Sequence, residues 1–204
     1  FVSKAGLFAA AIPFTTMIYG MVVTAFNIKV RKKTVIYNDL PVEFNGLRIA
    51  QISDLHSGSL KSSDLIRSAV NQILELKPDL IFFTGDLVNN EAAEAEPFIE
   101  EFKRLKATHG VYSVLGNHDY GDYGPWSSQE AKAANLQRLK EIHQESGWNL
   151  LLNDNITIQE SNSKLAIVGV ENWGASRHFP KYGDLDKAVV GVEDVPFKIL
   201  LSHD

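Results

Sequence analysis

Four short strings of metal-binding residue types each follow an apolar run of the chain. They are Asp54-Leu55-His56, Gly85-Asp86-Leu87-Val88-Asn89, Gly116-Asn117-His118-Asp119 and Ser202-His203-Asp204. Carboxylate, imidazole and amide groups recur in these strings, and such groups supply oxygen and nitrogen ligands to divalent metal ions. The chain contains no cysteine, which excludes a thiolate site. The strings therefore predict a metal site with oxygen and imidazole ligands.

Taken singly, most of the strings have an ordinary structural interpretation. Asp54 can be a hydrogen-bonded loop residue, Asp86 can cap a turn after a glycine, and His203 can lie at the surface. The Asp-x-His spacing nevertheless suits one ion, because side chains two residues apart in an extended segment return to the same side. The third string carries three functional groups in a row, which a turn does not explain. Four strings in succession favour a functional site.

The elements that must position these residues alternate between strand and helix. We expect buried strands at 47–53, 79–84, 111–116 and 197–203, helices at 64–77, 97–106 and 128–147, and short strands within 149–154, 156–161 and 164–172. Residues 34–46 fit an opening strand and loop. Ligands of α/β sheets gather beyond the carboxyl ends of the strands, which is where the four strings fall. The β-rich second half favours an α/β sandwich over a doubly wound sheet.

Composition limits the classes of protein to consider. With 204 residues, 45% of them hydrophobic, the chain can bury one sizeable core and carry an appendage. The net charge of -5 and a pI near 5.7 argue against a nucleic-acid partner, since proteins that bind nucleic acids usually present a basic face. The first strand is not followed by Gly-x-Gly-x-x-Gly, which disfavours a Rossmann nucleotide-binding domain. Both chain ends look cut, so we expect a fragment.

The N-terminal segment predicts a membrane anchor. The run from Ala5 to Phe26 carries no charge and has about the ~20 residues that a transmembrane helix needs. A secretory signal and a buried core helix are the rival interpretations. Lys29 and the basic run 31–33 follow the segment, against Lys4 before it, which places the next domain on the cytoplasmic side. We therefore expect an anchor with its basic flank at 1–33 and a catalytic domain at 34–204.

The four strings resemble those of the calcineurin-like metallophosphoesterases, from about Leu47 to the end of the chain. The resemblance implies an α/β fold, namely a four-layer α/β/β/α sandwich with a two-metal site between the strand ends. It implies that Asp54 and His56 bind the first metal ion and that Asn117 and His203 bind the second. Asp86 would bridge the two ions.

The resemblance also implies the chemistry of hydrolysis. His118 would stabilise the transition state or protonate the leaving oxygen, and Asp119 would orient it. Two cations about 3.5–4 Å apart can activate water and clamp a phosphoryl group. Mixed oxygen and nitrogen ligands favour Mn, Fe, Zn or Co over Ca. The implied substrate is a phosphomonoester, phosphodiester or pyrophosphate. The expected anchor favours a lipid-linked one, because enzyme and substrate would then share a membrane surface, and the chain resembles the membrane-associated branch of the family.

One family motif is missing from the sequence. The family carries a Gly-His-x-His string downstream, and the chain ends before reaching it, so each metal ion would lack one ligand. This departure keeps a second hypothesis open, in which the protein is a membrane-tethered module that binds phosphorylated ligands with weak or no catalysis. The intact visible ligands favour the enzyme.

A few other polar and aromatic residues receive simpler interpretations. His109 and His143 are expected at the surface, and Asn89 is expected to shape its loop. The loop with Arg177, His178 and Lys181 fits either a solvated loop or a phosphate-binding rim. The aromatic residues after the third string fit either a rim or packing, and they are Tyr120, Tyr123 and Trp126.

Overall fold

The computed structural model describes residues 12–17, 28–60, 62–174 and 180–203. The chain divides into two compact units, Phe1–Val35 and Ile36–Asp204. The four strings of potential metal ligands all lie in the second unit.

The described part of the first unit contains a short helix at 12–17. The hydroxyl groups of Thr15 and Thr16 donate to the carbonyl oxygen of Ile12 and so occupy an acceptor within this turn. Among the described residues, no helix has the length and apolar character required to cross a membrane. Most of the span expected between Ala5 and Phe26 lies outside the described residues.

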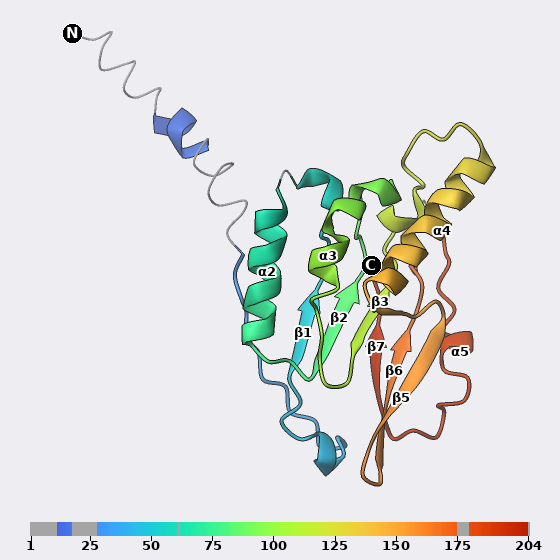
Figure 1. Ribbon diagram of the computed structural model, residues 1–204. Coiled ribbons are helices and arrows are strands. Elements are labelled where there is room, and N and C mark those ends of the chain that lie inside the picture. Colours follow the sequence, from blue (N-terminus) through green and yellow to red (C-terminus); the bar gives the residue numbers. More distant parts are fainter. Residues whose placement is uncertain (1–11, 18–27, 61, 175–179, 204) are drawn as a thin grey trace. The chain divides into compact units, whose positions relative to one another are not determined.

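A parallel sheet of four strands forms the centre of the second unit (Figure 1). Its order is β1-β2-β3-β4, and the strands are β1 (Ile49–Ile52), β2 (Leu80–Thr84), β3 (Val111–Val114) and β4 (Asn149–Leu150). All three pairings are parallel, so the carboxyl ends of the strands meet at one edge. The parallel sheet confirms the expected α/β class.

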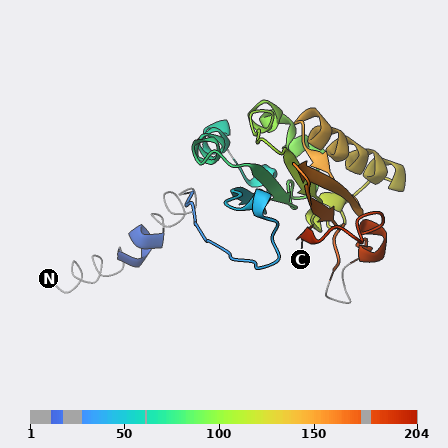
Figure 2. The ribbon, with the colours of Figure 1, turned by 90° about the horizontal axis from the view of Figure 1, so that it is seen from below.

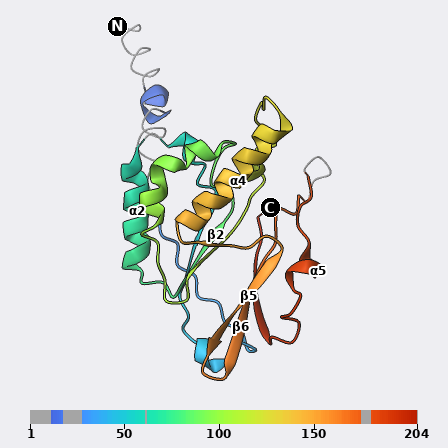
Figure 3. The ribbon, with the colours of Figure 1, turned by 45° about the vertical axis from the view of Figure 1, so that its right-hand side comes forward.

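Helices cover one face of the parallel sheet (Figure 3). They are α2 (Ser63–Glu75), α3 (Ile99–Phe102) and α4 (Gln129–Glu145). Serine hydroxyls cap α2 and α4, because Ser62 accepts from the Asp64 amide and Ser128 from the Ala131 amide. α3 is shorter than the helix expected at 97–106. At its start, residues 96–98 form a 3-10 turn instead of α-helix. After its end, the Leu105 amide bonds the Phe102 carbonyl oxygen, which is the tighter spacing of a 3-10 turn.

A second sheet packs against the other face of the first (Figure 2). Its order is β5-β6-β7, and the strands are β5 (Asp154–Glu160), β6 (Ser163–Gly169) and β7 (Phe197–Leu201). β5 and β6 are antiparallel, whereas β6 and β7 are parallel. The short helix α5 (Leu185–Ala188) contributes Ala188 to a third apolar cluster with the outer side of β6.

Alternation along β2 shows how the layers hold together. Every residue of β2 is buried, as expected for a strand covered on both faces. Ile81 and Phe83 pack with the helices, while Leu80 and Phe82 pack into the core between the two sheets. β2 is thus fixed from both sides, and the loop that leaves its carboxyl end starts from a rigid position.

Two local expectations are wrong. Residues 34–46 form no strand, because Pro41 lacks an amide donor and the segment continues as a 3-10 turn over Val42–Phe44, with Phe44 buried. His143 is not a surface residue but is fully buried, with its Nδ1 2.9 Å from the Ser113 hydroxyl. It lies four residues after the buried Leu139, on the face of α4 that packs against the sheet.

Candidate metal centre

The loops after β1 and β2 run side by side and are tied together by their backbones. The amides of Asp54 and His56 donate to the carbonyl oxygens of Gly85 and Asp86, each at 3.0 Å. Asp54, His56 and Asp86 all adopt positive φ, at 54°, 46° and 59°. Such left-handed backbone is strained for residues other than glycine, and the strain of non-glycine residues concentrates at functional sites. Six of the described non-glycine residues have positive φ, and three of them are expected metal ligands.

Asp86 lies at the centre of the site. Its Oδ2 is 3.5 Å from His56 Nε2 and 3.4 Å from His203 Nε2, and its Oδ1 accepts the backbone amide of His118 at 3.0 Å. The side chain is almost fully buried. Burial alone would raise the pKa of Asp86, but the bonds from His203 and from the His118 amide hold that pKa below its usual range. The carboxylate is thus kept ionised where several ligand groups converge.

His203 connects the second sheet to this site. Its Nδ1 donates to the Thr84 carbonyl oxygen at 2.7 Å, which directs Nε2 toward Asp86. The hydrogen bond to Asp86 raises the pKa of His203 to about 9, so without a metal ion the imidazole holds a proton. Metal binding requires the neutral ring, and a divalent ion would release that proton.

Two groups of side chains could each hold a metal ion. The first is His56, Asp86 and His118, and the second is Asp54, Asp86 and His203; within each group the ligand atoms lie within 4.8 Å of one another. Asp86 belongs to both groups. This partition differs from the expected one, which paired Asp54 with His56. The donor set fits divalent ions of the first transition row, because it mixes carboxylate oxygen with imidazole nitrogen.

Asn117 and His118 follow β3 at the same edge. The Asn117 amide nitrogen donates to the Tyr123 hydroxyl at 2.9 Å. His118 Nδ1 bonds the Asn89 carbonyl oxygen at 2.8 Å, and because a carbonyl only accepts, Nδ1 is the donor. The His118 ring also contacts the rings of His56 and Tyr123, at centroid distances of 4.8 and 4.7 Å.

Asp119 does not orient His118 as expected. It is fully buried, and its carboxylate accepts four backbone amides, those of Asp86, Leu87, Val88 and Gly116. Burial raises the pKa of Asp119 to about 7, while the amide donors favour its ionised form. Because three of the four amides belong to the loop after β2, Asp119 fixes the backbone that carries Asp86. The Asn89 carbonyl takes the place at His118 that was expected for Asp119.

Gly116 lets the loops after β2 and β3 approach closely. A Cβ atom on Gly116 would lie 2.2 Å from Asp86 Oδ1 and 2.6 Å from Asp86 N. No other residue type fits there without displacing Asp86. The glycine stood in the expected string, but its role depends on a neighbour thirty positions away, which the sequence does not reveal.

Tyr123 and Asn89 are the site residues that sequence reasoning missed or left open. Asn89 acts through a backbone carbonyl, which has no side-chain signature. From the sequence, Tyr123 could either line the rim of the site or pack in the interior. In the structure it contacts both Asn117 and His118. Arg177 and His178 lie outside the described residues, and Lys181 lies 5.5 Å from the ring of the exposed Trp173.

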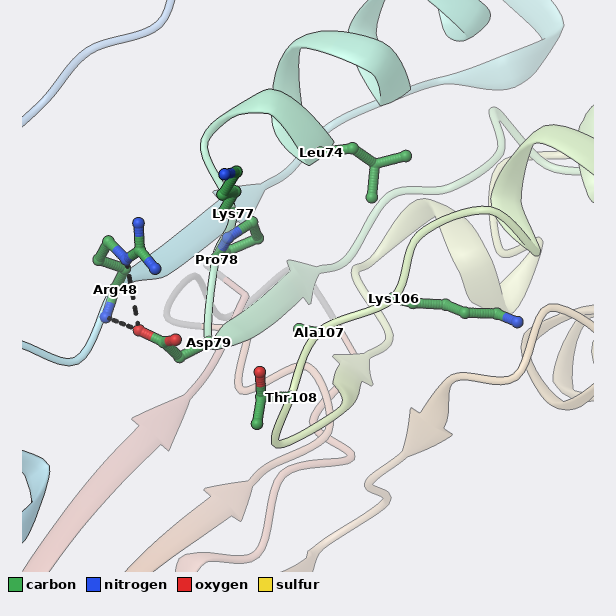
Figure 4. A pocket seen from close by; sticks show the side chains of 8 residues that line it. All are labelled: Arg48, Leu74, Lys77, Pro78, Asp79, Lys106, Ala107 and Thr108. Carbon is green, nitrogen blue, oxygen red and sulfur yellow. Dashed lines mark hydrogen bonds and ion pairs between the residues drawn. The ribbon is translucent and has the colours of Figure 1, made fainter.

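A separate hollow lies at the opposite edge of the parallel sheet. It has a volume of about 270 Å³ and is lined by residues that precede the strands, among them Arg48, Asp79 and Thr108 (Figure 4). Arg48 and Asp79 neutralise each other through an ion pair of 3.6 Å. None of the expected ligands lines this hollow.

Comparison with known proteins decides the family. The family model described as calcineurin-like phosphoesterase matches residues 47–204, which include every predicted ligand. The chain belongs to the calcineurin-like phosphoesterase family. Members of this family are metal-dependent hydrolases.

Individual relatives match over part of their length. A zebrafish (Danio rerio) transmembrane protein with metallophosphoesterase domain is 26% identical over 91% of this chain and 41% of its own length. The uncharacterized metallophosphoesterase YkuE of Bacillus subtilis is 33% identical over 48% of this chain and 35% of its own. The UDP-2,3-diacylglucosamine pyrophosphatase LpxG of Chlamydia trachomatis is 38% identical over 42% of this chain and 27% of its own. This calcineurin-like phosphoesterase chain thus spans less than half of each relative.

Proposed function

We propose that the protein hydrolyses phosphate esters with two divalent metal ions held at the carboxyl-terminal edge of the parallel sheet. The observation that carries the proposal is the position of Asp86, which is shared by two groups of potential ligands. A carboxylate has two oxygens, so one side chain can serve two ions. Asp54, His56, Asn117 and His203 complete the proposed ligand set, in a domain that we propose to be the four-layer sandwich of the family.

The ions and the protein have separate tasks. When bound, two such ions supply Lewis-acid activation of water and neutralise charge on the phosphoryl oxygens. Asp119 and the glycines after β2 and β3 hold the Asp86 loop in place. The bond from Nδ1 to Asn89 fixes the ring of His118, and Nε2 would pass a proton to the leaving oxygen from the ring that carries a proton on both nitrogens. Mn, Fe, Zn and Co all fit the mixed ligands.

His118 has two roles to distinguish, because it also belongs to one of the potential ligand groups. If it is the general acid, His118→Ala keeps both metal ions and lowers kcat by about 10²–10⁴-fold. The loss falls mainly on esters with poor leaving groups, since these need the proton most. If His118→Ala instead loses one ion, then His118 is a ligand and the assignment as acid is wrong.

The substrate class that we propose is a phosphomonoester, phosphodiester or pyrophosphate on a lipid-linked molecule. Relatives whose names describe a transmembrane protein and a pyrophosphatase for a diacylated sugar nucleotide support it. The uncharged run from Ala5 to Phe26 and the basic residues after it support a membrane anchor with the catalytic domain on the cytoplasmic side.

Hydrolysis by the full-length protein tests the activity and the substrate together. With Mn²⁺, we expect turnover of chromogenic phosphate esters and faster turnover of an acylated sugar nucleotide than of the same nucleotide without acyl chains. Equal rates on the acylated and the soluble substrates would contradict the proposal that the substrate is lipid-linked. A protein that binds Mn²⁺ and turns over none of these esters would support a binding module instead.

A further inference from the structure

Tyr123 stands beside two residues of the proposed site. Its hydroxyl accepts the Asn117 amide at 2.9 Å, and its ring lies 4.7 Å from the His118 ring, tilted by 46°. These two neighbours come from one loop, whereas Tyr123 lies beyond the turn that follows it. Tyr123 thus contacts the proposed neutral ligand and the proposed acid at the same time.

The bond to Asn117 has a direct consequence for metal binding. An amide offers one oxygen and one nitrogen, and only the oxygen binds a divalent cation. In the structure the Tyr123 hydroxyl engages the nitrogen, which leaves Oδ1 for the ion. Hydrogen bonds of this kind, one shell outside the metal ligands, orient a ligand before the ion arrives.

The ring of Tyr123 restrains His118 in a similar way. Asn89 fixes the position of Nδ1, but a single hydrogen bond leaves the ring free to swing about it. His56 meets the His118 ring edge-on at 86°, and Tyr123 contacts it as well. Three contacts therefore hold the imidazole in one orientation.

The segment around Tyr123 is itself well anchored. Asp122, directly before it, forms an ion pair with Lys132 of α4 and accepts the Tyr182 hydroxyl at 3.1 Å. On the other side, the Trp126 indole donates to the Gly121 carbonyl at 2.6 Å. The side chain of Tyr123 is nevertheless 44% exposed, which is too open for a core residue. An exposed ring on a fixed loop suits a residue that serves the site.

We propose that Tyr123 is a positioning residue, which orients Asn117 for the second metal ion and holds the His118 ring for proton transfer. This inference rests on the proposed two-metal function and names a residue that acts through the others. It predicts that the hydroxyl and the ring have separable effects. Loss of the hydroxyl affects metal binding through Asn117, and loss of the ring affects His118.

Calorimetric titration of the metal-free full-length protein with Mn²⁺ alone tests the first effect. We expect Tyr123→Phe to weaken binding of one of the two ions by about tenfold without changing the stoichiometry. In an Asn117→Ala background, Tyr123→Phe should have no further effect, because the coupling passes through Asn117. Tyr37→Phe is the matched control, since it removes a hydroxyl from an exposed tyrosine that packs on Phe197.

Kinetics test the second effect. Tyr123→Leu should lower kcat beyond Tyr123→Phe, and more for esters with poor leaving groups, with little change in KM. Mn²⁺ affinity within about twofold of the wild type in Tyr123→Phe, or an equal loss in the Asn117→Ala background, would overturn the assignment while leaving the two-metal site intact. Failure of the wild type to bind two ions would overturn the proposed function, and the role of Tyr123 with it.

Discussion

The side chains around Asp86 show how little freedom the site has. The carboxylate is placed by the amide of His118 on one oxygen and by two imidazoles near the other. Its backbone is placed by Asp119, which holds the amides of the same loop. Removing any one of these contacts should therefore loosen the ligand geometry before it unfolds the domain.

Gly116→Ala is the most direct test of this tight packing. The added methyl group would fall 2.2 Å from Asp86 Oδ1, so either the carboxylate or the loop must move. We expect Mn²⁺ affinity to fall by about tenfold or more and the free energy of unfolding to fall by about 1–3 kcal/mol. Titration calorimetry and urea unfolding measure the two effects.

Gly46→Ala supplies the control for Gly116→Ala. Gly46 has a φ of +83° and no atom within 4 Å of an added Cβ, so alanine there strains the backbone without touching a neighbour. It should cost about 1 kcal/mol of stability and leave metal affinity unchanged. If Gly116→Ala behaved like Gly46→Ala, the close approach to Asp86 would have no functional meaning.

Among the elements, α4 and β3 meet at a buried histidine. His143 contacts Ser113 through Nδ1, while its Nε2 is buried and has no hydrogen-bond partner among the described residues. Burial lowers the pKa of His143 to about 3, so the folded protein keeps the ring neutral. The unfolded chain protonates it near its usual pKa of about 6.5 and thus binds more protons than the folded chain at mildly acidic pH. The neutral His143 therefore contributes its full stabilisation above about pH 6.5. This stabilisation is lost as the pH falls from about 6.5 toward 3.

His143→Gln should remove this acid sensitivity. At about pH 5 the wild type should lose about 2 kcal/mol of unfolding free energy from His143 relative to neutral pH, and the variant should not. His109→Gln is the matched control, because His109 is partly exposed and its Nε2 lies 3.6 Å from Glu160 Oε1. Urea unfolding at both pH values measures the difference. Equal pH dependence in the wild type and His143→Gln would show that His143 is protonated in the folded state.

Much of the element pattern and of the site was predictable from the sequence, for physical reasons. Buried parallel strands are continuous apolar runs, and polar residues behind them must meet at one edge, which is how Asp86 and His203 were selected. The same reasoning does not reveal backbone acceptors such as the Asn89 carbonyl. It placed His143 at the surface because Gln144 and Glu145 follow it, although its spacing from Leu139 put it on the buried face. The expected partner of Asp119 was also wrong, since its carboxylate accepts three amides of the distant loop after β2 together with the nearby Gly116 amide.

At the scale of the whole molecule, the anchor remains a prediction. The uncharged run and the basic residues after it predict that the protein fractionates with membranes. Deleting residues 1–33 should release a folded, metal-binding domain into the soluble fraction, because residues from Ile36 onward form a compact unit.

Replacing Lys29 and the basic run 31–33 by glutamine should keep the protein in the membrane while disturbing its orientation. A full-length protein that stays soluble would remove the basis for the lipid-linked substrate.

The central claim is that one carboxylate, that of Asp86, serves two metal ions. Electron paramagnetic resonance of the full-length protein titrated with Mn²⁺ tests it most directly, because two ions that share a bridging carboxylate show exchange coupling. We predict two bound ions with a coupled spectrum in the wild type, and loss of the coupling together with at least one ion in Asp86→Asn. Two uncoupled ions in the wild type, or a coupled pair that persists in Asp86→Asn, would contradict the account.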